Sequence, residues 1–258
     1  MLVFTVSNNK GGVGKTTTAD NVAKALALRG AVVLQIDLDP QGNLTQSHAL
    51  PLIPTGQAPR LTMAQVLSAQ VPLARAVVRV GEGLYLAPGS PELLQTEKLL
   101  AAEPGGVLAL RELLAGVQGV DYVIIDTPPG MGVLTQSALT AADVVLIPVQ
   151  PEYYGLEGLA ALVNTCHQIK RRLNPGLRIG GIFFTRYNRN DNRRVLKDLV
   201  SLLEGHEVLG PLVMQWTVRE NVAVKQAQAR RQNLLLEYPT SFGAVDYIRL
   251  TSEILLRL

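Results

Sequence analysis

The sequence has little that would link it to a secreted, membrane-embedded or metal-cluster protein. A single cysteine among 258 residues excludes an internal disulfide framework, and no Cys/His cluster has zinc-ligand spacing. No hydrophobic stretch reaches the ~20 residues of a membrane span, and the N-terminus carries no targeting signal. Charged residues make up only 17% of the chain, against 47% hydrophobic residues. We therefore expect a soluble, cytoplasmic protein whose core needs no cross-links.

The charge balance is only weakly basic. Lys and Arg number 24 and Asp and Glu 21, which leaves a net charge of +3. Such an excess allows a polyanionic partner without demanding one. The lone cysteine, Cys166, lies in a helical pattern and is expected to pack in the interior.

Short hydrophobic runs alternate with helical patterns along the chain. The expected strands are residues 2–6, 31–36, 122–125, 144–149 and 178–184. The expected helices are residues 19–27, 92–101, 107–115, 134–142, 155–173, 193–203 and 242–258. Runs without period-two alternation are typical of buried parallel strands. The pattern predicts an α/β fold, doubly wound, with a mostly parallel sheet and helices on both faces.

The domain organisation is expected to be simple. No internal repeat or low-complexity tract divides the chain. Residues 51–59 hold three prolines and a glycine, which favours a surface loop over a linker between domains. We therefore expect one domain over residues 1–258.

The strongest motif is residues 10–17, Lys10-Gly11-Gly12-Val13-Gly14-Lys15-Thr16-Thr17, between an expected strand and an expected helix. This context is typical of a phosphate-binding P-loop. Glycines let backbone N–H groups approach phosphate oxygens, and the helix N-terminus adds its positive dipole. We expect Lys15 to neutralise β- and γ-phosphate charge and the Thr16 hydroxyl to bind Mg²⁺.

The loop departs from the usual P-loop pattern at its start. The pattern asks for glycine where Asn9 stands, while the glycines come later and a second lysine, Lys10, precedes them. Lys10 lies five residues before Lys15, on the rim of the loop. It is poorly placed to duplicate Lys15 on the same phosphates and better placed to reach a second nucleotide.

Two expected strands end in aspartate, where parallel sheets bind their ligands. One leads through Asp37 into a turn that holds Asp39, and the other ends at Asp126 in the manner of a Walker B segment. We expect Asp126 to hold Mg²⁺ through its water shell. Of Asp37 and Asp39, one can face the metal while the other contacts the attacking water.

These residues together resemble the ParA-type partition ATPases of the deviant Walker A (MinD/ParA) superfamily. Four motifs carry the resemblance, in order: residues 10–18, 37–43, 126–130 and 148–158. The likeness covers the chain from Leu2 onward and weakens after about Asn190. It implies an ATPase that forms a sandwich homodimer with two ATP molecules, each with Mg²⁺, at the interface.

The resemblance implies individual roles at the phosphates. Lys10 would cross to the partner's nucleotide, Lys15 would bind its own, and Thr17 would contact the α-phosphate. The loop residues Gly11, Gly12, Val13 and Gly14 would bind phosphate through the backbone.

It also implies roles at the metal and the base. Thr16 would coordinate Mg²⁺, Asp37 and Asp126 would support the metal, and Asp39 would position the hydrolytic water. Relatives commonly hold adenine with a Pro-Arg-Asn turn. The matching turn here is Arg219-Glu220-Asn221, so Asn221 carries over while Arg219 stands in place of proline.

Members of this family bind double-stranded DNA non-specifically as ATP dimers and release it after hydrolysis stimulated by a ParB-like partner. The same behaviour here would make the protein cytoplasmic and nucleoid-associated. The candidate DNA-binding residues are basic and concentrated in the C-terminal half: Arg193, Arg194, Lys197, Arg219, Lys225, Arg230 and Arg231.

Three alternatives compete with a DNA-partition ATPase. A membrane-cycling ATPase of the MinD kind calls for a basic amphipathic C-terminal tail, and residues 247–258 hold only Arg249 and Arg257 against Glu253. A reductase-type iron protein needs two cluster cysteines per subunit, and the chain has one. A non-hydrolysing nucleotide switch stays open, although Lys15 and the carboxylates argue against it.

Overall fold

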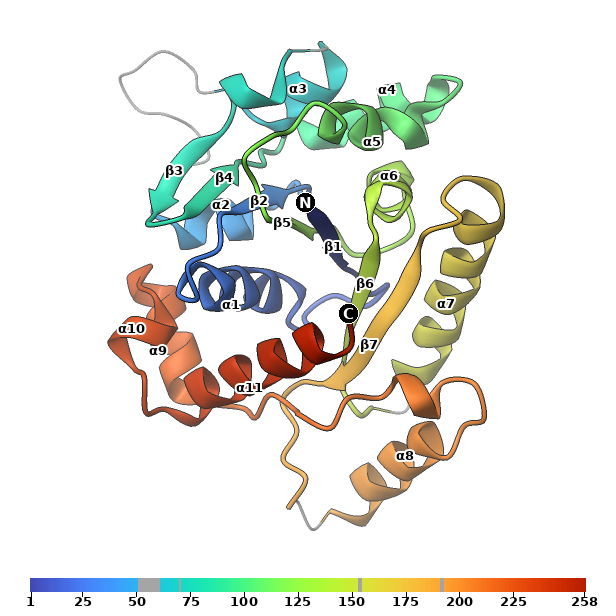
Figure 1. The fold of residues 1–258 in the computed structure, drawn as a ribbon. Coiled ribbons are helices and arrows are strands. Elements are labelled where there is room, and N and C mark those ends of the chain that lie inside the picture. The colour runs from blue at the N-terminus through green and yellow to red at the C-terminus, as the bar shows by residue number, and fades with distance from the viewer. Residues whose placement is uncertain (51–60, 70, 153–154, 191–192) are drawn as a thin grey trace.

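The computed structural model describes residues 1–50, 61–69, 71–152, 155–190 and 193–258, and the loop expected at 51–59 lies outside them. Seven strands form one sheet in the order β3-β4-β2-β5-β1-β6-β7 (Figure 1). The strands are β1 (Leu2–Val6), β2 (Val33–Asp37), β3 (Val78–Gly81), β4 (Leu84–Ala87), β5 (Tyr122–Asp126), β6 (Val144–Val149) and β7 (Arg178–Phe184). Every pairing is parallel except β3 with β4. This confirms the predicted fold class.

Helices cover both faces of the sheet. They are α1 (Lys15–Ala27), α2 (Asn43–Ser47), α3 (Met63–Ser68), α4 (Leu93–Ala102), α5 (Ala109–Leu114), α6 (Val133–Ala141), α7 (Gly155–Arg172), α8 (Arg194–Glu204), α9 (Val222–Arg230), α10 (Leu234–Glu237) and α11 (Phe242–Leu256). Short 3₁₀ turns occupy Leu73–Arg75, Gly106–Leu108 and Gly210–Leu212. In Figure 1, α1, α9, α10 and α11 lie on one face, and α3 to α7 lie on the other.

Successive strand residues supply two separate cores. In β1, Val3 packs into the cluster that includes α3 to α7, while Phe4 packs into the cluster formed with α1 and α11. In β5, Val123 and Ile125 join the first cluster and Ile124 the second. Because both faces are covered, these strands read as continuous hydrophobic runs.

The β3–β4 hairpin at the sheet edge was not expected from the sequence. Its strands are four residues long and include the exposed Arg79 and the half-buried Gly81. Its turn passes through Gly83 with φ 62°. β3 is half-buried or exposed along its length, and β4, although largely buried, is only four residues long, so neither stands out in the sequence as the central strands do.

The lone cysteine is part of the core. Cys166 lies on α7, is 2% exposed, and packs with the α3–α7 cluster. Burial raises the pKa of its thiol to about 12, and a hydrogen bond within the residue offsets this only in part. The thiol is therefore protonated at neutral pH. Among the described helices, none is both long and apolar enough to cross a membrane.

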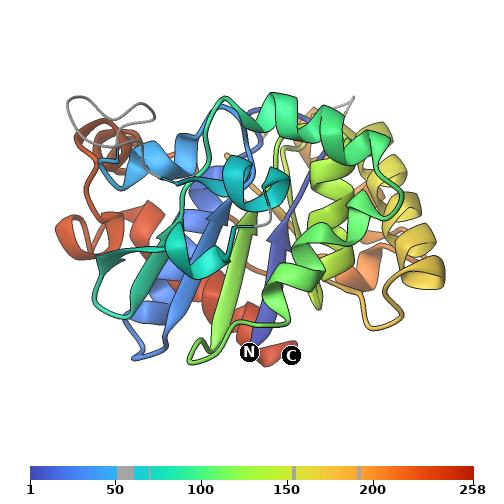
Figure 2. The ribbon, with the colours of Figure 1, turned by 90° about the horizontal axis from the view of Figure 1, so that it is seen from above.

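The chain ends lie away from the motifs. Figure 2 shows both termini at the edge where the parallel strands begin. Arg178, the first residue of β7, donates to the carbonyl oxygen of Arg257 at 2.9 Å and so ties the end of α11 there. The P-loop and the predicted carboxylates lie at the opposite edge, where β1, β2 and β5 end.

Phe4→Ala should strongly destabilise the fold. Its ring is fully buried in the central strand, and its removal leaves a cavity between the sheet and α1. We expect the free energy of unfolding to fall by about 3–5 kcal/mol, measured by urea denaturation. Leu256→Ala, at a side chain that is 87% exposed, serves as the control and should change it by less than ~0.5 kcal/mol. Similar losses in the two variants would contradict the assigned core.

Candidate nucleotide-binding site

The segment between β1 and α1 has the backbone of an anion-binding loop. Gly12 and Gly14 have φ values of 75° and 91°, which side-chain-bearing residues rarely adopt. Gly14 directly precedes the first turn of α1, so the N-terminus of that helix faces the loop. Unpaired N–H groups and the helix dipole at this point favour a bound phosphate.

Neighbouring strands fix the outer side of this loop. The Thr185 hydroxyl, just after β7, donates to the Val13 carbonyl oxygen at 2.8 Å. The Gln150 amide, just after β6, donates to the Gly12 carbonyl oxygen at 2.9 Å. With these carbonyl groups bonded to side chains outside the loop, the loop is shaped before any ligand arrives.

Lys15 is buried against the loop. Its ammonium group donates to the Lys10 carbonyl oxygen at 3.0 Å, and the residue is 6% exposed. Burial lowers the pKa of Lys15, and the charges of Asp126 and Asp39 oppose that effect. A buried cation within the fields of two carboxylates is suited to polyphosphate binding.

Asp37 is a buried carboxylate with partners inside the protein. Its oxygens accept hydrogen bonds from the Thr45 backbone N–H at 2.8 Å, the Thr45 hydroxyl at 2.7 Å and the Asp39 backbone N–H at 3.1 Å. Burial raises its pKa to about 6 in spite of these bonds. The structure thus anchors Asp37 to the turn that carries Asp39.

Asp126 is buried without such partners. Among the described residues, no donor meets hydrogen-bond geometry at either of its oxygens, and the side chain is fully buried. Burial raises its pKa well above the usual range, and the charge of Asp37 adds to that effect, while the nearby Thr16 side chain and Lys15 lower it. Asp37 and Asp126 are partners in the register of β2 and β5.

An uncompensated carboxylate beside the Thr16 hydroxyl fits a Mg²⁺ site. Hard cations prefer oxygen ligands, and Mg²⁺ commonly takes one or two carboxylates together with phosphate oxygens and water. Within the described ranges no group of three or more His, Cys, Asp or Glu could hold a metal alone. The donor set therefore suits magnesium that arrives with a phosphate ligand.

A cavity of about 570 Å³ opens over the loop. The P-loop residues that line it are Gly11, Gly12, Gly14, Lys15, Thr16 and Thr17. Asp39 also lines it, and its Oδ1 accepts from the Gln41 backbone N–H at 2.9 Å. The structure thus places the predicted water-positioning residue beside the predicted phosphate-binding residues.

A smaller cavity of about 80 Å³ adjoins the first and shares Gly14 and Thr17 with it. Asn221 and Val224 line it from the start of α9. The Asn221 side-chain oxygen caps α9 by accepting from the Ala223 backbone N–H at 2.9 Å. Asn221 therefore lines a cavity that adjoins the P-loop cavity, and the cap occupies only its side-chain oxygen.

Comparison with known proteins agrees with this geometry. The AAA domain family model matches residues 1–179. The chain is 39% identical over 254 residues to the chromosome-partitioning ATPase Soj of Thermus thermophilus, covering 98% of this chain and 95% of that protein. It is 36% identical to the chromosome partitioning protein ParA of Caulobacter vibrioides, covering 99% and 94%.

The chain belongs to the ParA/Soj family of P-loop ATPases. A solved structure of cobyrinic acid a,c-diamide synthase from Mycobacterium smegmatis, with bound ATP analogue and magnesium, superposes with a TM-score of 0.82. That protein is 31% identical, and the alignment covers 99% of this chain and 94% of the other. The ATPase described here accordingly uses ATP and Mg²⁺.

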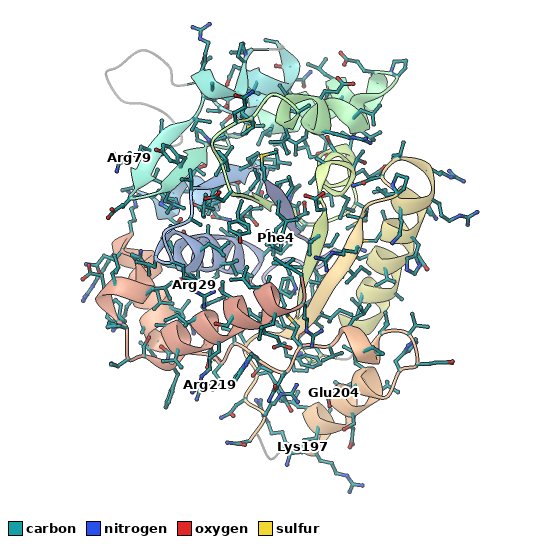
Figure 3. The ribbon with its side chains drawn as sticks, in the orientation of Figure 1. Phe4, Arg29, Arg79, Lys197, Glu204 and Arg219 are labelled. Atoms are coloured by element: carbon teal, nitrogen blue, oxygen red, sulfur yellow. The ribbon has the colours of Figure 1, made fainter. Side chains whose placement is uncertain are left out.

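Arg219 has an internal role in this ATPase. Its Nε and Nη2 donate to the two Asp246 carboxylate oxygens at 2.9 and 2.6 Å, and its guanidinium lies 4.1 Å from the Phe242 ring centre. Figure 3 labels Arg219 close to α11, the helix that carries both partners. The predicted roles of Arg219 at the base and at DNA stay predictions, and in this structure its guanidinium is engaged with both carboxylate oxygens of Asp246.

The other predicted basic residues differ in their surroundings. Lys225 pairs with Glu220 at 2.7 Å, and Arg230 donates to the Tyr238 hydroxyl at 3.0 Å. Arg231 lines the P-loop cavity. Three exposed residues lie at the start of α8: Arg193, Arg194 and Lys197. Figure 3 labels Lys197 at its lower edge.

The motif at 148–158 reaches the P-loop from β6. Glu152 forms an ion pair with Lys10, and both side chains are accessible, at 54% and 36%. Tyr153 and Tyr154 of this motif lie outside the described residues.

Four residues at this site were not singled out from the sequence: Thr45, Gln150, Thr185 and Gln228. Thr45 binds Asp37, Gln150 and Thr185 bind the loop, and the Gln228 amide donates to the Thr17 hydroxyl at 2.8 Å. Gln150 and Thr185 follow the ends of expected strands, so the rule that located Asp126 could have found them.

Asp126→Asn should stabilise the nucleotide-free ATPase most at alkaline pH. A carboxyl group whose folded pKa is raised favours folding below its ordinary pKa and loses that contribution as pH rises through the raised value. The Asn side chain does not ionise, so the variant keeps its stability as pH rises. The substitution also removes a like charge beside Asp37. In EDTA, we expect the gain in Tm over the wild type to be larger at about pH 8 than at about pH 5.

Asp198→Asn provides the control, because Asp198 is exposed on α8. Its effect on Tm should be small at both pH values. A gain for Asp126→Asn that does not change with pH would contradict the uncompensated burial of this carboxylate.

Proposed function

We propose that this ATPase partitions DNA by forming an ATP-bound sandwich dimer that binds double-stranded DNA without sequence preference. Hydrolysis, stimulated by a ParB-like partner, then releases the DNA. The observation that carries the proposal is Lys10, a second lysine on the rim of a P-loop that keeps Gly14, Lys15 and Thr16. Similarity to Soj and ParA proteins over nearly the whole chain supports the same function.

The positions of the side chains support the hydrolytic roles that we assign to them. Lys15 binds the phosphates from within the loop, and Asp39 orients the attacking water in the same cavity. Thr16 and Asp126 hold Mg²⁺, with Asp37 supporting them from the next strand. When bound, Mg²⁺ neutralises charge on the β- and γ-phosphate oxygens. We assign adenine contact to Asn221.

Lys10 must change partner for the dimer to form. In the single chain it pairs with Glu152 on the protein surface. Exposed ion pairs contribute only about 0–1 kcal/mol, so exchange of Glu152 for the partner's phosphates is energetically undemanding. A phosphate in a closed interface offers a much stronger electrostatic contact than a solvated carboxylate.

Lys10→Ala should keep ADP binding but lose ATP-dependent dimerisation. Removal of a charged contact to the reacting phosphates should lower hydrolysis at least about 100-fold. Light scattering with ATP and a phosphate-release assay measure the two effects. Lys98→Ala, at an exposed lysine on α4, is the matched control and should behave as the wild type. A persistent dimer of normal activity in Lys10→Ala would refute the crossing role.

The start of α8 is our first choice for the DNA-binding surface. Arg193, Arg194 and Lys197 are exposed there within five residues of sequence, and α8 projects from the body beyond β7 (Figure 1). Dimerisation doubles such a patch, which raises the number of phosphates contacted at once. Lys225, Arg230 and Arg231 form the second choice.

DNA binding should require ATP and should depend on salt. Changing Arg193, Arg194 and Lys197 together to Gln should weaken binding equally on unrelated duplexes. It should also reduce the magnitude of the log–log salt slope by about 0.9 for each lost phosphate contact. Fluorescence anisotropy with random duplexes measures both quantities. ATPase activity without DNA should survive, because these residues lie outside the P-loop cavity.

The control is a charge-matched triple variant, Arg75, Arg79 and Lys98 to Gln, on exposed positions. Figure 3 shows Arg79 on the side of the molecule away from Lys197. An equal loss of DNA affinity in both triple variants would show that binding depends only on net charge and not on the surface at α8. Equal affinity with ADP and ATP would contradict the proposed cycle.

The C-terminal segment does not favour a membrane-cycling function. Leu250 and Ile254 of α11 are buried in the α1 core cluster, so this face is not available to a lipid surface. We propose one ATPase domain over residues 1–258 that acts in the cytoplasm on the nucleoid. A turnover assay separates it from a non-hydrolysing switch.

A further inference from the structure

Two arginines reach the P-loop cavity from the C-terminal part of the chain. Arg186 follows the end of β7 and Arg231 follows α9, and both line the cavity with Lys15 and Thr16. Arg186 also lines the adjoining small cavity with Asn221, so it lies at the junction of the two. Neither arginine belongs to the four motifs that identify the family.

Both arginines have an unfavourable backbone conformation. Of the residues that the structure describes, three other than glycine have φ in the left-handed region: Ala49 (59°), Arg186 (51°) and Arg231 (55°). A Cβ makes this conformation costly. At Arg231 it is the left-handed cap that ends α9, whereas Arg186 lies at no helix end, so its conformation is set by the surrounding structure. Two of the three positions are arginines that line the same cavity.

Each arginine is adjacent to a side chain that contacts the nucleotide-binding segment. Thr185, next to Arg186, donates to the Val13 carbonyl oxygen at 2.8 Å. The Gln228 side-chain amide donates to the Thr17 hydroxyl at 2.8 Å. The Gln228 backbone carbonyl oxygen accepts from the Arg231 backbone N–H at 3.1 Å. The chain at both arginines is therefore held close to the loop by short, specific connections.

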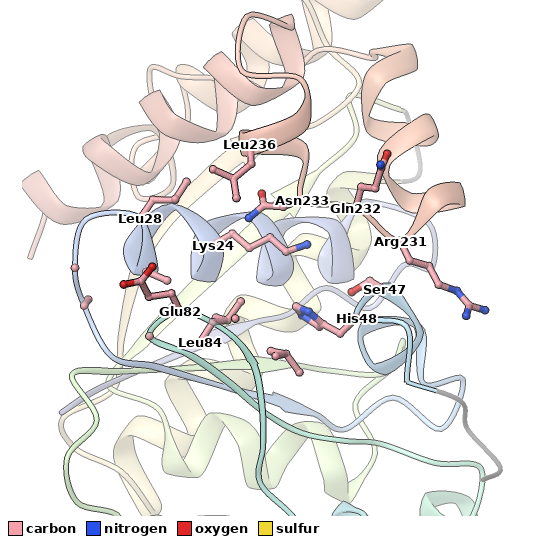
Figure 4. Close-up of a pocket in the computed structure, with 16 residues that line it drawn as sticks. Lys24, Leu28, Ser47, His48, Glu82, Leu84, Arg231, Gln232, Asn233 and Leu236 are labelled. Carbon is pink, nitrogen blue, oxygen red and sulfur yellow. The ribbon is translucent and has the colours of Figure 1, made fainter. Parts of the chain in front are cut away.

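The surrounding carboxylates do not neutralise these arginines. Asp20, which also lines the cavity, binds Lys24 at 2.7 Å and lies 3.2 Å from His48. Figure 4 shows Arg231 extending outward beyond His48, away from Lys24. In the part of the chain that the structure describes, neither Arg186 nor Arg231 forms an ion pair within 4.0 Å. Glu220 forms its ion pair with Lys225, which lowers the pKa of the carboxyl, and the charge of Arg186 adds only to that lowering.

We propose that Arg186 and Arg231 bind the nucleotide, through its phosphates and the adjoining ribose, from the open side of the P-loop. Guanidinium groups are suited to phosphate oxygens because they donate in a planar fork and stay charged. Arg186 contacts the part of the nucleotide between the phosphates and the base, and Arg231 contacts the phosphates from α9. This assignment rests on the P-loop cavity being the nucleotide site.

Arg186→Gly and Arg231→Gly test the proposal without disturbing the backbone. Glycine adopts positive φ freely, so each variant removes the guanidinium and relieves the unfavourable conformation. We expect the Tm of the nucleotide-free variants to be at or above that of the wild type. ADP and ATP, titrated by calorimetry, should bind at least about tenfold more weakly to each variant, the loss expected for a charge-assisted hydrogen bond.

Ala49→Gly is the matched backbone control, because Ala49 has the same conformation but does not line the cavity. Arg79→Gln controls for loss of one positive charge on β3. Both should leave nucleotide affinity unchanged. Affinity within about twofold of the wild type in either arginine variant would overturn the assignment of that arginine.

Two further measurements separate this inference from the function proposed above. Lys15→Ala, titrated alongside, must lose nucleotide binding; if it retains binding, the cavity itself is wrongly assigned and the arginine proposal fails with it. Loss for Lys15→Ala but not for the arginine variants overturns only the arginine assignment. Arg231→Gly that weakens DNA binding while nucleotide affinity stays normal overturns the role of Arg231 in favour of the DNA surface.

Discussion

Two buried carboxylates placed side by side dominate the electrostatics of this ATPase. Asp37 and Asp126 end adjacent strands in register, and neither side chain is exposed to solvent. Like charges in such a site raise each other's pKa and oppose folding unless a cation or hydrogen bonds compensate them. Thr45 and the Asp39 amide compensate Asp37, while Asp126 depends on Lys15 and on what binds beside Thr16. The repulsion between these two carboxylates therefore opposes folding, and binding of a cation beside Thr16 relieves it.

The sequence predicted the central part of this arrangement well, because that part depends on local and regular features. The P-loop is contiguous, and its glycines and lysine are placed by one strand–turn–helix unit. Asp37 and Asp126 lie far apart in sequence, yet both end strands of a parallel sheet, and such ends meet at one edge. Strand positions therefore located the carboxylates, whereas the division of roles between Asp37 and Asp39 came from the family resemblance.

Features that depend on contacts between residues far apart in the sequence could not be predicted in this way. Arg219 looked like a surface cation because Asp246, its partner, lies 27 residues further along the chain. The strands of the β3–β4 hairpin are only four residues long, too short to stand out as a pattern, and α9 lacks a clear hydrophobic stripe. Arg231 was predicted from the sequence only as a surface cation, and Arg186 was not singled out, because the cavity that both line and their backbone angles cannot be predicted from residue types.

The burial of Cys166 makes the chain a convenient starting point for site-directed labelling. Its thiol is enclosed in the α3–α7 core and stays protonated near neutral pH, so it reacts little with maleimide reagents, which are attacked by an accessible thiolate. A cysteine introduced on the exposed face of α8 or at the rim beside Lys10 can then carry a fluorophore or spin probe without prior removal of the native one. Distances between such probes on two chains report directly on subunit association during the nucleotide cycle.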